Sequence, residues 1–166
     1  NAGTGFGRIW PDTLQNTGVG RNYGLELTVE RFFAGGFYFM TTASLFDAKY
    51  QGSDGEWRNT VFNGRYAFNV LAAKEIKLGK NNRFNVGIKY TTVGGRWFVA
   101  QVDETETLRT GEIVFVDETN NTVQYRAYER FDLKLGYKWN NPNTAWEFGL
   151  DLSNLTSNKN ILTLTY

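Results

Sequence analysis

Apolar and polar residues alternate along the stretch from Tyr125 to Ser153. In its first run the apolar side chains occupy every odd position over 131–139, and in its second run every even position over 146–152. Because successive side chains of a β-strand point to opposite faces, this period of two predicts two strands, each with one apolar and one polar face. The turn-forming residues NNPN between the two runs predict that they form a hairpin.

The same alternation recurs upstream and predicts further strands over about 22–33, 37–50, 61–78 and 83–90. In the second of these, the apolar parity changes after Leu45, which predicts either a β-bulge near Leu45 or an interior that is less polar there. Lys74 breaks the apolar parity of the third, near a strand end where its ammonium can extend to a polar interface. With the final run ILTLTY, the pattern predicts an all-β, antiparallel up-and-down meander of about six long strands plus a stub.

The connections between the predicted strands alternate in length. AGG, GKNN and NNPNT are short, whereas the leading segment, QGSDGEWRN and the connection from about Val93 to Val123 are longer. Since antiparallel strands place successive connections at opposite ends, one rim has only tight turns and the other only loops. This asymmetry is typical of an outer-membrane barrel with periplasmic turns and extracellular loops, and a soluble sandwich has no reason to show it.

Aromatic residues gather beside the short turns, while aliphatic residues fill the middle of the strands. This is the pattern of a lipid-facing barrel wall with an interfacial girdle, although one soluble hairpin with aromatic cross-strand pairs would look similar. The predicted girdle residues are Phe33, Phe37, Tyr137, Trp139 and Trp146. Together with the connections, they predict that the meander is part of a transmembrane β-barrel.

Composition excludes several other classes of protein. The 166 residues include no Cys and no His, which removes thiolate and imidazole metal ligands and the Ser–His and Cys–His nucleophilic pairs. No catalytic, cofactor-binding or metal-binding residue is therefore predicted, and we expect no enzyme. The net charge of +1 gives no general attraction to nucleic acid. The start, NAGTGFGRIW, lacks the charged head and apolar core of a signal peptide, so we expect a piece of a longer exported protein.

Two groups of side chains are candidates for contact with a solute. The polar strand faces carry charges that would line the barrel lumen, either as a solvated wall paired with a plug or as a substrate path. They include Glu26, Arg65, Lys89, Arg130, Asp132, Lys134 and Asp151. The second group, on the predicted outer loops, consists of Trp57, Trp97 and Phe98, which could stack on a ligand or belong to the interfacial girdle.

From about Asn16 onward the chain resembles the C-terminal barrel region of TonB-dependent outer-membrane receptors, closest to the subgroup with a carboxypeptidase-regulatory-like extension. The segments that carry the resemblance are NTGVGRNYGLELTVERFF, GGFYFMTTASLFDAKYQGSDGEWRNTVFNGRYAFNVLAAKE, YERFDLKLGYKWN and WEFGLDLSNLTSNKN. It implies a Gram-negative outer-membrane barrel of about 22 strands around a plug domain. It also implies uptake of a scarce nutrient, of the siderophore, glycan or peptide class, with energy from the inner membrane through TonB.

The chain has no plug, no TonB box and no final strand of that family, so we expect residues 1–166 to be a single segment of a larger receptor barrel. The implied partners are the rest of the barrel, its plug, the lipid bilayer and the TonB complex, with a surface lipoprotein as a further candidate and no nucleic acid. Two alternatives remain. One is a small complete outer-membrane barrel with a structural or adhesive role, which would need at least eight strands. The other is a soluble β-sandwich binding module.

Overall fold

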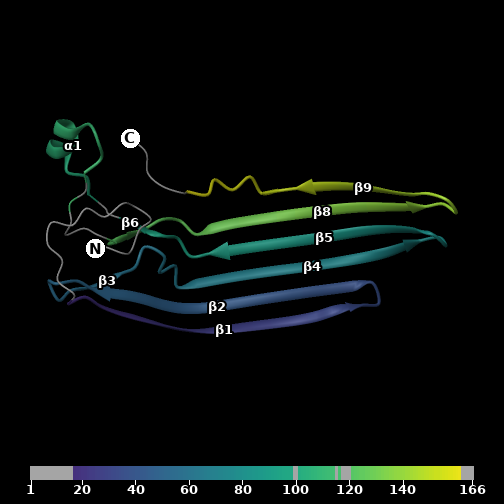
Figure 1. Ribbon diagram of the computed structural model, residues 1–166, viewed down its shortest axis with the longest axis horizontal. Helices are drawn as coiled ribbons and strands as arrows, with labels where there is room; N and C mark the ends of the chain where they lie inside the picture. Colours follow the sequence, from purple (N-terminus) through teal and green to yellow (C-terminus); the bar gives the residue numbers. More distant parts are fainter. Residues whose placement is uncertain (1–16, 99–100, 115, 117–120, 162–166) are drawn as a thin grey trace.

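The computed structural model describes residues 17–98, 101–114, 116 and 121–161, and its main feature is one antiparallel sheet. Each long strand pairs with the next long strand along the chain, which confirms the predicted all-β meander (Figure 1). The long strands are β1 (Val19–Ala34), β2 (Phe37–Gln51), β4 (Tyr66–Leu78), β5 (Asn82–Val93), β8 (Tyr128–Asn140) and β9 (Ala145–Leu152). Within the described residues the sheet is open, with β1 and β9 at its edges.

Short elements gather at one end of the sheet, while the other end has only tight turns (Figure 1). They are β3 (Trp57–Asn59), β6 (Trp97–Phe98), α1 (Glu104–Thr110) and β7 (Val123–Gln124). The sequence predicted only a loop between β5 and β8. Asp103 caps the start of the helix there, since its carboxylate accepts the Glu106 N–H at 3.0 Å, and Gly111 caps its end with a left-handed φ of 73° that suits glycine. One end of the sheet, the turn rim, therefore has only tight turns, and the other end, the loop rim, has the longer connections, as predicted.

The pairing register collects the apolar positions of all long strands on one side of the sheet. Directly paired residues share a face, and the pairs run in rows such as Leu27–Ala43–Phe68 and Leu133–Ile88–Ala72. We call this side the apolar face: it consists of the odd residues of β1 up to Arg31, the odd residues of β2 and β8, and the even residues of β4, β5 and β9. The opposite side, which carries most of the strand charges, is called the polar face.

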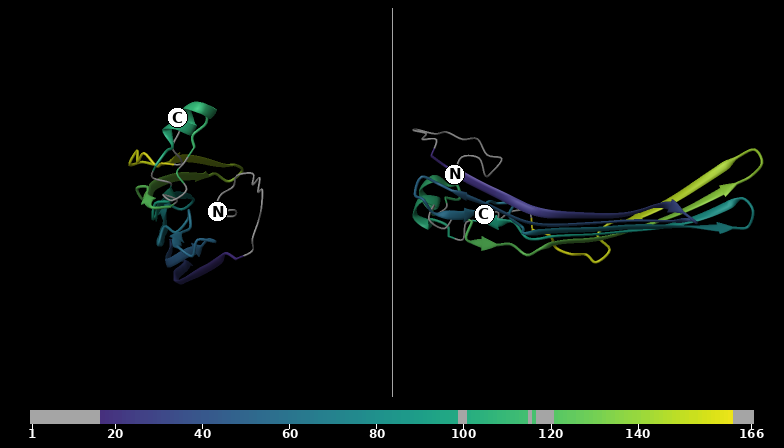
Figure 2. Two further views of the ribbon diagram at one scale, coloured as in Figure 1. Left: turned by 90° about the vertical axis from the view of Figure 1, so that its left-hand side faces the viewer. Right: turned by 90° about the horizontal axis from the view of Figure 1, so that it is seen from below.

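Nothing among the described residues covers the apolar face. The sheet is a single bent layer (Figure 2), and no hydrophobic side chain of the described residues is buried. Leu25 is 79% exposed and Trp146 is 57% exposed. A soluble sandwich would bury such a face against a second layer, whereas a barrel wall presents it to lipid.

The structure distinguishes the two interpretations of the parity change after Leu45. No bulge lies there, because Leu45 pairs in unbroken register with Leu25 and with Tyr66. The register shift lies instead between Arg31 and Ala34, beside the β1–β2 turn. The interior is less polar after Leu45, which was the other interpretation of the parity change.

The strand predicted from residue 61 begins only at Tyr66, because residues 61–65 form a turned segment. Its Asn63-Gly64 pair is a turn-forming sequence. The side chain of Asn63 accepts the N–H of Ala48 at 2.9 Å, where a further strand residue would otherwise pair. The predicted stub ILTLTY lies outside the described residues except for Ile161.

The tight hairpins do not end at the same level. Phe37, the first residue of β2, pairs with Lys74, and β4 continues past that point to Leu78, which pairs with Asn82. The tips step outward from the β1–β2 hairpin to the β8–β9 hairpin (Figure 1). Such a stagger is the shear that tilted strands of a barrel wall require.

Candidate functional site

The polar face collects the predicted lumen-facing charges from four strands, with Arg65 as the exception. The members that the register places on this face are Glu26, Lys89, Arg130, Asp132, Lys134 and Asp151. Opposite charges meet there: Lys89 pairs in register with Asp132, and Lys134 Nζ lies 3.5 Å from Asp151 Oδ1. Since the Lys134 and Asp151 side chains are 72% and 65% exposed, their pair adds little stability and leaves a solvated surface of mixed sign.

Arg65 lies just before β4 rather than within the alternating strand where it was predicted. Its backbone is left-handed, with a φ of 69°, and its carbonyl accepts the N–H of Phe46 at 2.9 Å. Its guanidinium carbon lies 5.5 Å from the ring centre of Trp97. The charge of Arg65 is therefore held against a loop aromatic at the loop rim.

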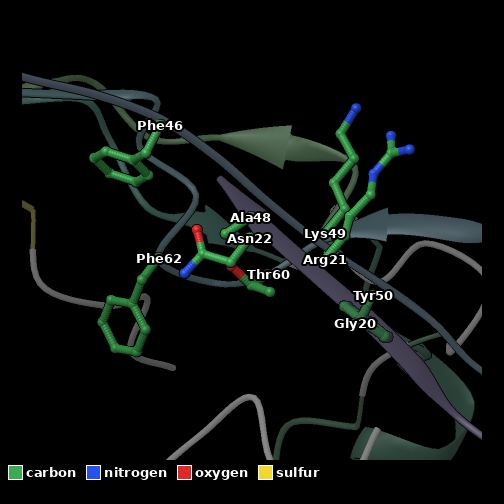
Figure 3. A pocket seen from close by; sticks show the side chains of 9 residues that line it. All are labelled: Gly20, Arg21, Asn22, Phe46, Ala48, Lys49, Tyr50, Thr60 and Phe62. Atoms are coloured by element: carbon green, nitrogen blue, oxygen red, sulfur yellow. The ribbon is translucent and has the colours of Figure 1, made fainter. Parts of the chain in front are cut away.

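A hollow of about 500 Å³ opens on the polar face near the loop rim. Figure 3 shows Asn22, Phe46 and Phe62 on one side of the strands, while Arg21 and Lys49 are directed away. Phe46, Ala48 and Tyr50 line it, and they are the residues whose parity conflicted with a uniformly polar interior. Aromatic rings beside a few amide and hydroxyl groups are the usual lining of a small-molecule site. The sequence showed this feature only as an irregular parity.

The three predicted outer-loop aromatics have different surroundings. Trp97 donates its indole N–H to the carbonyl of Asn63 at 2.7 Å, and Phe98 stacks on Tyr125 with ring centres 4.1 Å apart. Trp57 is 42% exposed, with the Arg21 guanidinium 4.5 Å from its ring centre. Trp97 and Phe98 thus pack the loops together, whereas Trp57 keeps an accessible ring. Contact of any of them with a ligand stays a prediction.

Asn63 is the hub of the loop rim, and the sequence reasoning did not single it out. It is fully buried, and its amide nitrogen donates to Asp47 Oδ1 and Asn59 Oδ1, each at 2.9 Å. Together with the bonds to Ala48 and Trp97, the side chain and the backbone carbonyl of Asn63 connect β2, β3 and β6. The Asn-Gly sequence was a local signal for a turn, but not for these long-range contacts.

Close backbone contacts hold the same region together. A Cβ on Gly94 would lie 1.7 Å from the carbonyl oxygen of Gly64, so only glycine fits at position 94 without a shift. The N–H of Gly94 also donates to the carbonyl of Tyr66 at 3.0 Å. The loop that follows β5 is thereby fixed against the start of β4.

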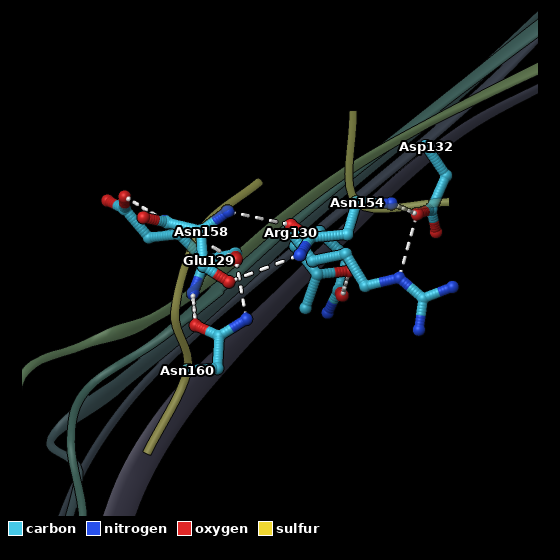
Figure 4. Close-up of polar contacts among 8 residues, drawn as sticks. Glu129, Arg130, Asp132, Asn154, Asn158 and Asn160 are labelled. Atoms are coloured by element: carbon cyan, nitrogen blue, oxygen red, sulfur yellow. Dashed lines mark hydrogen bonds and ion pairs between the residues drawn. The ribbon is translucent and has the colours of Figure 1, made fainter. Parts of the chain in front are cut away.

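Asparagines after β9 fasten that segment to the start of β8 (Figure 4). Asn158 donates to Glu129 Oε2 at 3.0 Å, and Asn160 Oδ1 accepts the Glu129 N–H at 3.0 Å. The backbone N–H of Asn154 donates to Asp132 Oδ1 at 2.8 Å, and that same oxygen lies 2.7 Å from Arg130 Nε. These side-chain bonds continue the pairing of β8 beyond the end of the regular ladder.

Four of the five predicted girdle residues lie on the apolar face beside the turn rim. Trp139 pairs directly with Trp146, Tyr137 pairs with Phe148, and Phe37 pairs with Lys74. Phe33 lies in the register shift near the β1–β2 turn, where the alternation is interrupted. Their contact with a membrane interface remains a prediction.

Among the described residues, no group of three or more His, Cys, Asp or Glu side chains could hold a metal ion. In the same part of the chain, no helix is long and apolar enough to cross a membrane.

Comparison with known proteins identifies a family that the chain matches. A family model described as "TonB dependent receptor-like, beta-barrel" matches residues 1–155. No curated protein and no solved structure matches the chain. The matched span contains all six long strands and the connections between them.

Proposed function

Because the chain belongs to the TonB dependent receptor-like β-barrel family, we propose that its six long strands form part of the wall of a larger receptor barrel. The family acts in TonB-dependent transport at the outer membrane, so this chain is an outer-membrane transport protein rather than a member of an enzyme family. The proposed cargo is a scarce nutrient of the siderophore, glycan or peptide class. The carboxypeptidase-regulatory-like subgroup is part of the same proposal.

The observation that carries the proposal is the uncovered apolar face that runs across all six long strands. Lipid covers such a face in a barrel wall, and the tight turns gathered at one rim fit the periplasmic side. Bacterial barrels have at least about eight strands and no free edge. Further strands beside β1 and β9 would remove the two edges of the described sheet.

The polar face then faces a plug domain and the transported nutrient. The strands β5, β8 and β9 carry charges of both signs, which suits a barrel wall that faces water. A plug could move along such a wall without having to break one strong ion pair. The hollow beside Phe46, Tyr50 and Phe62 lies near the outer, loop-bearing rim, where an incoming nutrient would arrive first. The plug, the TonB complex and a surface lipoprotein are the proposed partners.

The test is the size of the folded native protein. The polypeptide would be isolated from the outer-membrane fraction, and its intact mass and its migration before and after heating would be measured. We expect a mass several times the 18.9 kDa of these residues, and heat-modifiable migration. A folded monomer near 18.9 kDa would contradict the larger barrel and favour a small complete barrel with a structural or adhesive role.

A further inference from the structure

The apolar face carries two cations at the turn rim, Arg31 and Lys74. Both flank Phe37: the Arg31 guanidinium carbon lies 5.5 Å from the centre of its ring, and the Lys74 nitrogen lies 6.0 Å from it. Lys74 also donates to the carbonyl of Gly35 in the β1–β2 turn, at 3.3 Å. Two cations from different strands are thus held around one aromatic ring.

Neither cation has an acidic partner on this face. Among the described residues, no ion pair joins Arg31 or Lys74 to a carboxylate. Near the loop rim, by contrast, Lys49 on the same face lies 3.6 Å from Asp47. Both Arg31 and Lys74 are exposed. The turn rim therefore presents unbalanced positive charge on the side that faces lipid.

The two cations lie toward the turn-rim end of the apolar band. Arg31 is the last apolar-face residue of β1 before the register shift, and on β4 only Ile76 and Leu78 follow Lys74 on this face. On β1 the apolar-face positions from Tyr23 to Arg31 span about 26 Å at ~3.3 Å per residue. A strand tilt of about 40° reduces this to roughly 20 Å of height, close to the ~25 Å apolar band of outer-membrane barrels. On β4 the interval from Tyr66 to Lys74 has the same length. From these positions the long side chains of both cations can extend to the level of the lipid phosphates.

We propose that Arg31 and Lys74 bind the headgroup of an anionic phospholipid in the periplasmic leaflet, beside the β1–β2 turn. The Arg31 guanidinium can donate two hydrogen bonds to a phosphate, and Lys74 supplies a point charge. Phe37 restrains both side chains and contacts the upper part of the acyl chains. This site contacts the bilayer and is independent of the transported nutrient.

The test uses the complete receptor in mild detergent, freed of lipid. Native mass spectrometry would give the dissociation constants of phosphatidylglycerol and of phosphatidylcholine. A basic residue near an anionic surface contributes ~1 kcal/mol. We therefore expect Arg31→Gln and Lys74→Gln each to weaken the binding of phosphatidylglycerol about fivefold, and the double variant to weaken it about thirtyfold. Binding of phosphatidylcholine should not change.

The matched control is Lys77→Gln with Lys89→Gln, which removes the same charge from the polar face. It should leave phosphatidylglycerol binding unchanged, and heat-modifiable migration would verify that every variant is folded. If the Arg31 and Lys74 double variant fails to fold, Lys74→Gln alone gives the answer. Unchanged phosphatidylglycerol binding in a folded Arg31 or Lys74 variant, or an equal loss in the control, would overturn the proposal. Because the receptor barrel is tested separately, by the intact mass and heat-modifiable migration of the native protein, failure here leaves the transport function standing.

Discussion

Two adjacent small residues of β2 provide a direct test of which face of the sheet meets lipid. Ala43 lies on the apolar face between Leu27 and Phe68, and Ser44 lies on the polar face opposite Glu26. Leu27 is midway between Tyr23 and Arg31, so Ala43 lies near the centre of the apolar band. The substitutions Ala43→Arg and Ser44→Arg introduce the same side chain one residue apart, on opposite faces.

The expected difference can be worked out from the two environments. An arginine on the lipid face near the bilayer midplane costs ~2–4 kcal/mol, a factor of roughly 30 to 1,000 in the folding equilibrium. Alanine itself buries little area, so its loss adds little to this cost. At position 44 the arginine would face water and the Glu26 carboxylate, which Ser44 now contacts at 3.5 Å. An opposite-charge pair across strands contributes about 0.2–1 kcal/mol, so Ser44→Arg should be close to neutral.

The assay is reversible folding of the complete receptor into lipid vesicles, with guanidinium as denaturant and heat-modifiable migration as the measure of the folded fraction. We expect Ala43→Arg to lower the free energy of unfolding by a few kcal/mol and to reduce the amount assembled in the outer membrane. Ser44→Arg should behave like the wild type. If Ser44→Arg costs as much as Ala43→Arg or more, the assignment of the two faces is wrong. If neither substitution has an effect, the sheet does not lie in lipid.

Three further predictions concern the loop rim. Asn63→Ala should destabilise it by about 1–3 kcal/mol, because a buried N–H loses its acceptor; faster protease cleavage of the outer loops on intact cells would be the measurement, and an unchanged rate would contradict the hub. Gly94→Ala should reduce the folded yield of the receptor, since its Cβ would overlap the Gly64 carbonyl; a normal yield would show that the two segments can separate freely. The Glu56 N–H, followed by the Arg58 guanidinium at 2.6 Å, lowers the pKa of the Asp54 carboxyl below its ordinary value. The contacts of this carboxylate order the loop at neutral pH, and they are lost as the pH falls through the lowered pKa. Arg58→Gln removes one of them and should therefore raise the Asp54 pKa in a carboxyl NMR titration. An unchanged pKa would contradict the contact.

The long strands could be predicted because the sequence of each strand alone shows which of its residues face an apolar environment and which face water. Residues such as Leu133 and Leu135 alternate with charged or small neighbours, and this period of two needs no knowledge of the partner strand. The tight hairpins could also be predicted from local sequence. Gly35 and Gly36, for example, both adopt the left-handed backbone that a two-residue turn requires. Except for Arg65, the positions of the predicted lumen-facing charges followed from the same parity.

The loop rim could not be predicted in the same way, because its order depends on contacts between distant segments. Asn63 acquires its role only when β2, β3 and β6 meet around it, and the nearest sequence signal was an ordinary turn-forming pair. The hollow beside Phe46 and Tyr50 was missed for a different reason. The parity change after Leu45 had two interpretations, a bulge or a less polar interior, and neither of them indicated a hollow.

The stagger of the hairpins has a geometric consequence for the whole receptor. When a sheet closes on itself, the accumulated displacement between neighbouring strands and the number of strands together determine the radius of the cylinder. The pairing of Phe37 with Lys74 and of Leu78 with Asn82 determines the displacement from the β1–β2 tip to the β4–β5 tip. The pairing of Arg83 with Lys138 and of Asn140 with Ala145 extends it to the β8–β9 tip. In the proposed receptor barrel these strands would therefore contribute a defined share of the diameter through their backbone pairing alone, independently of loops and plug.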